Sequence, residues 1–155
     1  MPTPLEPGTK APAFTGKDQH GHTVSLKDLK GRRVILYFYP QDDTPACTAQ
    51  ACNLRDHHEL LLRAGYTVIG VSPDGEPSHQ AFMQKYSLPF PLLADPEHRI
   101  IQKYGVWGEK NLYGRKYMGL LRTTFVIDES GIIRKIFRKP RTKAHAEEIL
   151  KAMGG

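Results

Sequence analysis

Two mostly apolar stretches, each of β-strand length, constrain the fold more than any other feature of the sequence. They are residues 33–39 and 66–72, and a segment with helical features, residues 45–64, separates them. Strands that are apolar nearly throughout are typical of sheets covered on both faces. A helix between two strands is typical of a parallel crossover. The pattern therefore predicts an α/β fold with a parallel pair at the centre of its sheet.

The rest of the chain predicts shorter elements around this unit. In chain order we expect a hairpin over 13–24, a short helix with a capping box at 25–28, a helix from Ser78 to about Tyr86, an extended segment at 89–94, a helix at 97–104, a loop-rich segment at 107–120, strands at 123–128 and 132–138, and a helix at 142–153. The order predicts one domain, residues 1–155, with a mixed central sheet flanked by helices. This is the arrangement of a thioredoxin-like fold with an N-terminal hairpin extension.

Composition is that of a globular protein, with 39% apolar and 25% charged residues in a chain of 155. No run approaches the roughly 20 apolar residues of a membrane span, and no signal peptide is visible. We therefore expect a cytoplasmic protein without a membrane partner. The net charge of +6 is densest over residues 134–143, where apolar residues interrupt the cations. That pattern favours a solvated face, or a docking surface for an acidic protein, over nucleic-acid binding.

Cys47 and Cys52 are the only cysteines of the chain. A cytosolic protein rarely keeps a static disulfide, so the two are either packing residues or a redox pair. With Thr44 as N-cap and Pro45 as the first helical residue, Cys47 lies in the first turn of its helix. The free N–H groups and the helix dipole there favour the thiolate, which is the nucleophilic form.

The spacing of the two cysteines limits how they can bond. Five residues along an ideal helix place their Cα atoms about 8.6 Å apart, whereas a disulfide requires less than about 7 Å. Cys47 and Cys52 can therefore bond only if the first turns of the helix unwind. Small side chains around them leave less packing to oppose unwinding, namely Ala46, Thr48, Ala49 and Ala51.

The residues around Cys47 resemble a known family. Residues 40–47 read Pro-Gln-Asp-Asp-Thr-Pro-Ala-Cys, which resembles the P-x-x-x-T-x-x-C signature of peroxiredoxins. A second cysteine five positions later is similar to the PrxQ, or bacterioferritin comigratory protein, subfamily. Further similar segments extend over most of the chain, at residues 71–74, 90–95, 104–108 and 122–128.

The resemblance implies an atypical 2-Cys, thioredoxin-dependent peroxidase that reduces hydrogen peroxide and organic hydroperoxides. Cys47 would be the peroxidatic cysteine, and Cys52 would resolve its sulfenic acid to an intramolecular disulfide. Thioredoxin or a glutaredoxin-like protein would then reduce that disulfide. Thr44 would hydrogen-bond the peroxide and Pro40 would shield the pocket. Arg122 would stabilise the thiolate and the charge that develops on the peroxide oxygens.

One position departs from the resemblance. Relatives often carry a glutamate where this chain has Gln50, three residues after Cys47. The amide removes a negative charge near the thiolate and an anchor for a nearby arginine. The resemblance otherwise implies a monomer without a cofactor.

The sequence is also compatible with a function other than peroxide reduction. A non-enzymatic redox sensor or chaperone could use the same cysteine switch, and the rate of reaction with peroxide separates the two. The histidine pairs at residues 20, 22 and 57–58 have no third ligand at a suitable spacing, so we expect surface histidines and no metal site.

Overall fold

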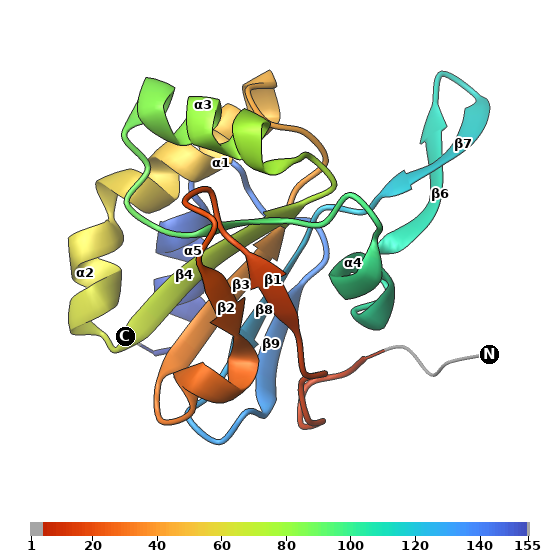
Figure 1. Ribbon diagram of the computed structural model, residues 1–155. Helices are drawn as coiled ribbons and strands as arrows, with labels where there is room; N and C mark the ends of the chain where they lie inside the picture. Colours follow the sequence, from red (N-terminus) through yellow and green to blue (C-terminus); the bar gives the residue numbers. More distant parts are fainter. Residues whose placement is uncertain (1–4, 155) are drawn as a thin grey trace.

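The computed structural model describes residues 5–154, in which the strands form a seven-stranded sheet and a separate two-stranded one (Figure 1). The strands are β1 Thr15–Lys17, β2 Thr23–Ser25, β3 Arg33–Phe38, β4 Tyr66–Ser72, β5 Leu92–Ala94, β6 Trp107–Leu112, β7 Arg115–Leu120, β8 Thr123–Ile127 and β9 Ile133–Phe137. The large sheet has the order β2-β1-β5-β4-β3-β8-β9. β3 pairs with β4 in parallel and with β8 in antiparallel register. The predicted mixed α/β architecture is confirmed.

Helices lie on both faces of the large sheet. They are α1 Pro45–Asp56, α2 His58–Arg63, α3 Glu76–Tyr86, α4 Arg99–Lys103 and α5 His145–Ala152, with a short 3₁₀-helix at Leu26–Leu29. Residues of α4 pack in one hydrophobic cluster, and residues of α1, α2, α3 and α5 pack in another. The thioredoxin-like arrangement thus has helices on either side of its sheet, as Figure 1 shows.

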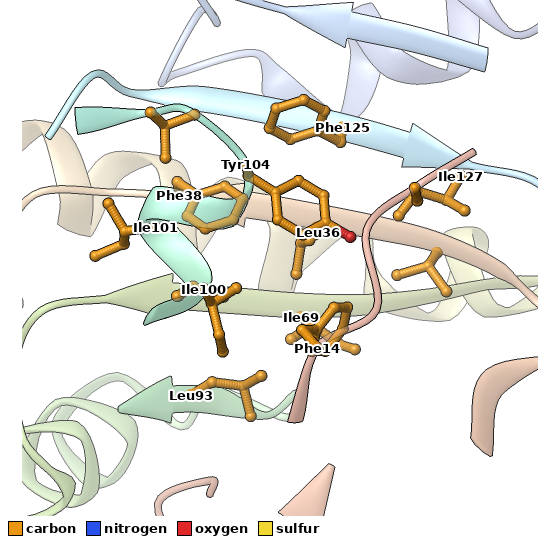
Figure 2. Packing of buried hydrophobic residues seen from close by; sticks show 14 of the residues in the cluster. Phe14, Leu36, Phe38, Ile69, Leu93, Ile100, Ile101, Tyr104, Phe125 and Ile127 are labelled. Atoms are coloured by element: carbon orange, nitrogen blue, oxygen red, sulfur yellow. The ribbon is translucent and has the colours of Figure 1, made fainter. Parts of the chain in front are cut away.

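Successive residues of the central strand β3 belong alternately to these two clusters. Leu36 and Phe38 belong to the α4 side, where Figure 2 shows Phe38 beside Tyr104 and Phe125. Tyr37 belongs to the cluster on the other side. Successive strand residues point to opposite faces, so a strand covered on both faces must be apolar at every position. The buried end of β3 places the following loop, and with it the start of α1.

The segment predicted as one helix over residues 45–64 is two helices. α1 ends at Asp56 and α2 begins at His58. At His57 the backbone N–H lies 3.3 Å from the carbonyl oxygen of Asn53, and the ring Nδ1 lies 2.9 Å from the same oxygen. A side chain that enters the hydrogen-bond ladder in this way interrupts a helix.

The loop-rich prediction for residues 107–120 is wrong, because β6 and β7 form a hairpin that pairs with no other strand of residues 5–154. Figure 1 shows this hairpin projecting from the body of the protein. Its turn residues Tyr113 and Gly114 have φ values of 53° and 79°, as a tight hairpin turn requires. The strands escape sequence analysis because they lack the alternation of apolar and polar residues that marks a half-buried strand.

Two predicted helix caps are also absent. Ser25 precedes the 3₁₀-helix but makes no side-chain cap bond, and its hydroxyl lies 3.0 Å from the hydroxyl of Thr15 instead. α3 starts at Glu76 rather than Ser78, with Gly75 as N-cap. The hydroxyl of Ser78 instead donates to Oδ2 of Asp42 at 2.7 Å.

Candidate active site around Cys47

Cys47 lies in the first turn of α1, directly after the loop that leaves the end of β3. Thr44 is the N-cap residue, with extended backbone angles, and Pro45 is the first helical residue. The predicted start of the helix is therefore confirmed. The side chain of Cys47 is buried, with 1% of its residue surface exposed. A sulfur in this position faces N–H groups without helical acceptors, at the positive end of the helix dipole.

Arg122 reaches Cys47 from a distant part of the chain. Its Nη2 donates to Sγ of Cys47 at 3.3 Å, and its Nη1 donates to Oε1 of Gln50 at 2.7 Å. The sheet explains the contact: Thr123 of β8 pairs with Phe38 of β3, so Arg122 lies level with the end of β3. None of the ion pairs within residues 5–154 includes Arg122. Its positive charge is therefore available to the sulfur.

The side chain of Gln50 binds the guanidinium of Arg122. It is fully buried, and its Oε1 accepts from the guanidinium while its Nε2 has no hydrogen-bond partner among the described atoms. Because the amide is neutral, it orients Arg122 without cancelling its charge. The expectation that an amide at residue 50 removes the anchor of a nearby arginine is therefore wrong, because Oε1 of Gln50 accepts from Nη1 of Arg122 at 2.7 Å.

Tyr37 lies below α1 in the same cluster as Cys47. Its hydroxyl is also buried without a partner among the atoms described. Burial raises the pKa of Tyr37 well above its ordinary value, and negative charge on the neighbouring sulfur of Cys47 raises it further. The phenol therefore stays protonated beside the thiol at physiological pH.

Thr44 and Pro40 lie at the two ends of the loop. Thr44 makes no cap bond to α1, and its hydroxyl donates to the carbonyl oxygen of Gln41 at 2.9 Å. Since the hydroxyl proton is used in that bond, the oxygen lone pairs remain to accept a hydrogen bond. Pro40 is the second residue after β3 and is half-buried. The structure thus places Thr44, Cys47 and Arg122 together, with Pro40 at the start of the loop.

Cys52 lies on the same helix as Cys47, and both thiols are free. Because α1 is unbroken from Pro45 to Asp56, ideal helix geometry keeps the two Cα atoms about 8.6 Å apart. Cys52 is half-buried, and burial raises the pKa of its thiol above the ordinary value, with Arg55 opposing and Asp56 adding to the rise. In this state the helix keeps the two sulfurs from bonding.

Comparison with known proteins agrees with this geometry. The sequence profile of the AhpC/TSA family matches residues 7–136. Peroxiredoxin Bcp of Bacillus subtilis is 45% identical over 149 residues, which cover 96% of this chain and 95% of that protein. Peroxiredoxin Bcp of Escherichia coli is 43% identical over 147 residues, or 95% of this chain and 94% of that protein. The chain belongs to the AhpC/TSA family of peroxiredoxins.

Solved structures place this peroxiredoxin among the PrxQ proteins. PrxQ of Xylella fastidiosa superposes with a TM-score of 0.91 at 26% identity, covering 99% of this chain and 98% of that one. The bacterioferritin comigratory protein of Xanthomonas campestris superposes with a TM-score of 0.85 at 30% identity, covering 91% of this chain and 90% of that one. The family makes this chain a thiol peroxidase of thioredoxin-like fold.

Sequence reasoning overlooked two polar residues near the site of this peroxiredoxin. Asp42 belongs to the loop before Cys47, and His79 lies on α3 with its side chain fully buried. Their side chains meet at 2.7 Å. The signal that could have revealed Asp42 is its place inside the P-x-x-x-T-x-x-C motif. The sequence gives no local signal for His79, because a single histidine on a helix does not indicate which distant residue it binds.

The rest of the described surface adds no second chemical centre. A groove of about 300 Å³ lies near the start of β3, where Arg32 and Val34 line it, and it includes no residue of the thiol site. Within residues 5–154 no group of three or more His, Cys, Asp or Glu side chains could hold a metal ion. None of the helices described is long and apolar enough to cross a membrane.

Proposed function

We propose that this peroxiredoxin reduces hydrogen peroxide and organic hydroperoxides through a disulfide cycle between Cys47 and Cys52. The observation that carries the proposal is the 3.3 Å contact from Arg122 to the buried sulfur of Cys47. A cation and a helix N-terminus on one thiol favour the thiolate. They also lie where negative charge develops when that thiolate attacks an oxygen.

In the first step the thiolate of Cys47 attacks one peroxide oxygen. An S–O bond forms and the O–O bond breaks, which leaves a sulfenic acid and an alkoxide or hydroxide. The leaving oxygen takes a proton and departs as alcohol or water. Arg122 stabilises the negative charge during transfer, the Thr44 oxygen accepts the hydrogen bond of the hydroperoxide, and Pro40 limits access of water to the pocket.

In the second step the thiolate of Cys52 attacks the sulfur of the sulfenic acid. An S–S bond forms, the S–O bond breaks, and the hydroxide that leaves becomes water by taking a proton. Because the intact helix separates the two Cα atoms by about 8.6 Å, the first turns of α1 must unwind before this step. Two electrons from a dithiol protein of the thioredoxin or glutaredoxin kind then restore both thiols by disulfide exchange.

The decisive experiment follows the reduced protein by intact mass and free-thiol count after one equivalent of hydrogen peroxide. We expect both thiols to disappear within seconds, a product lighter by two hydrogens, and a peptide that links Cys47 to Cys52. Cys47→Ser should not react. Cys52→Ser should react once and stop as the sulfenic acid. Persistence of both thiols for hours would refute the proposal, and a slow reaction would favour the redox sensor or chaperone.

The physiological setting forms the last part of the proposal. Because Cys52 is half-buried rather than fully buried, the disulfide can be reached by a reductant protein once the helix unwinds. We place the enzyme in the cytoplasm as a monomer. Light scattering during size-exclusion chromatography of the reduced and the oxidised protein tests the monomer, because a mass of twice 17.5 kDa in either form would contradict it.

A further inference from the structure

A buried histidine–aspartate pair joins the loop before Cys47 to helix α3. Nδ1 of His79 lies 2.7 Å from Oδ2 of Asp42. The side-chain surfaces are 0% exposed for His79 and 5% for Asp42. Removal of one partner of a buried pair is costly, because it leaves the other partner buried and uncompensated.

Every polar atom of this pair has a partner. Nε2 of His79 lies 3.0 Å from the carbonyl oxygen of Leu93, which can only accept, so that nitrogen carries a proton. On Asp42, Oδ1 accepts from the hydroxyl of Tyr39 at 2.6 Å and Oδ2 accepts from the hydroxyl of Ser78 at 2.7 Å. The contact between Nδ1 of His79 and Oδ2 of Asp42 completes this network.

The same loop has further anchors. The backbone N–H of Asp42 donates to Oδ2 of Asp74 at 2.6 Å. The next residue, Asp43, has a left-handed φ of 58°, and its carboxylate accepts from Nζ of Lys85 and the hydroxyl of Tyr86, both at 2.8 Å. Both carboxylates of the loop are therefore bound by groups of α3. Left free, either would place a negative charge within five residues of the thiolate.

We propose that Asp42 and His79 are positioning residues for Cys47. By fixing the loop to α3, they fix Thr44 at the N-cap and hold the first turn of α1 closed around the sulfur. The inference rests on the proposed function, because it explains how the N–H groups and the Thr44 hydroxyl stay in place for the reaction. Neither residue touches the sulfur, and their effect passes through the backbone of the loop. A misplacement of about 1 Å can lower a rate about 100-fold.

The test compares variants that break the pair with one that keeps its hydrogen bonds. Asp42→Ala and His79→Ala remove one partner. In Asp42→Asn the amide can still accept from Tyr39 and donate to a neutral His79. All variants are made in a Cys52→Ser background, which leaves Cys47 as the single thiol. The readouts are the second-order rate with hydrogen peroxide, the rate of Cys47 alkylation by iodoacetamide as a function of pH, and the melting temperature.

We expect the two alanine variants to lose about tenfold or more in the peroxide rate, and to be alkylated more slowly below pH 8. Asp42→Asn should stay within about threefold of the parent. Leu61→Ala, which removes a fully buried side chain of α2, is the control for lost stability and should keep both rates. If an alanine variant fails to fold, Ser78→Ala removes a single bond to Asp42 and should give a smaller loss in the same direction.

Several outcomes would overturn the inference. Folded alanine variants with parental rates would show that the pair positions nothing. Equal rate losses in Leu61→Ala would show that stability alone is responsible, and a loss in Asp42→Asn as large as in Asp42→Ala would exclude positioning by hydrogen bonds. If the parent does not react with peroxide, the proposed function fails, but the order of the alkylation rates still decides the role of the pair.

Discussion

Replacement of Arg122 by methionine tests the electrostatic basis of the site. Methionine keeps much of the apolar stem but removes the charge that lies 3.3 Å from Sγ of Cys47. Coulomb's law gives about 1.3 kcal/mol for two unit charges at that separation in water, and about 5 kcal/mol at an effective dielectric constant of 20. Because Arg122 is half-exposed, we take the lower part of that range, about 1.4 to 2.8 kcal/mol.

An energy of this size corresponds to a loss of about 10- to 100-fold in the rate of attack on peroxide. The assay measures the single-turnover rate of Arg122→Met with hydrogen peroxide in the Cys52→Ser background. The rate should fall because the guanidinium stabilises the negative charge that develops on the peroxide oxygens.

The matched control is Arg63→Met, which removes an exposed arginine paired with Glu59 at the end of α2. It should leave the peroxide rate unchanged. The melting temperature of Arg122→Met needs to be measured as well, because Gln50 then loses its hydrogen-bond partner, at a cost of about 1–3 kcal/mol. A peroxide rate that matches the parent would refute the electrostatic reasoning, even if the fold were weakened.

Three more predictions follow from burial and close packing. The disulfide-forming step should accelerate about tenfold per pH unit between about pH 7 and 8.5, because burial raises the pKa of Cys52; a flat profile by rapid-quench mass analysis would contradict this. Burial lowers the pKa of His145, with Glu148 opposing, so its neutral form stabilises the fold above about pH 6.5 and this contribution is lost as the pH falls further. His145→Gln should flatten the acid limb of urea stability, whereas the exposed control His20→Gln should not. Gly70→Ala should destabilise by about 1–3 kcal/mol in urea, since its Cβ would lie 2.9 Å from Cζ of Tyr37; an unchanged midpoint would show that the ring moves freely.

The local parts of the site could be predicted from sequence. The start of α1 follows from Thr44 and Pro45, which act within one turn, and the buried strands follow from their continuous apolar character. The position of Arg122 could not be derived in this way, because it depends on the register between β8 and β3. That pairing joins residues more than 80 positions apart, and only the resemblance to peroxiredoxins pointed to it.

The missed partners of Ser25, Ser78 and Asp42 have the same physical origin. The caps at Ser25 and Ser78 were predicted from local sequence, but each hydroxyl found a partner elsewhere in the fold. The partnership of Asp42 and His79 spans 37 residues and exists only after α3 packs against the loop. Polar contacts across the fold therefore escape an analysis that depends on local spacing.

The β6–β7 hairpin can accept a change of length at its turn but not added side-chain volume at its base. Because these strands pair only with each other, residues could be inserted at the Tyr113–Gly114 turn in cross-strand pairs without altering any ladder of the large sheet. Near the base this freedom ends, since a Cβ on Gly108 would lie 2.9 Å from Cδ1 of Leu121, the neighbour of Arg122. The turn of the β6–β7 hairpin is thus a site where the length of the chain can vary during evolution and where a fluorophore can be attached. The base of the hairpin at Gly108, close to Leu121 and Arg122, stays sterically constrained.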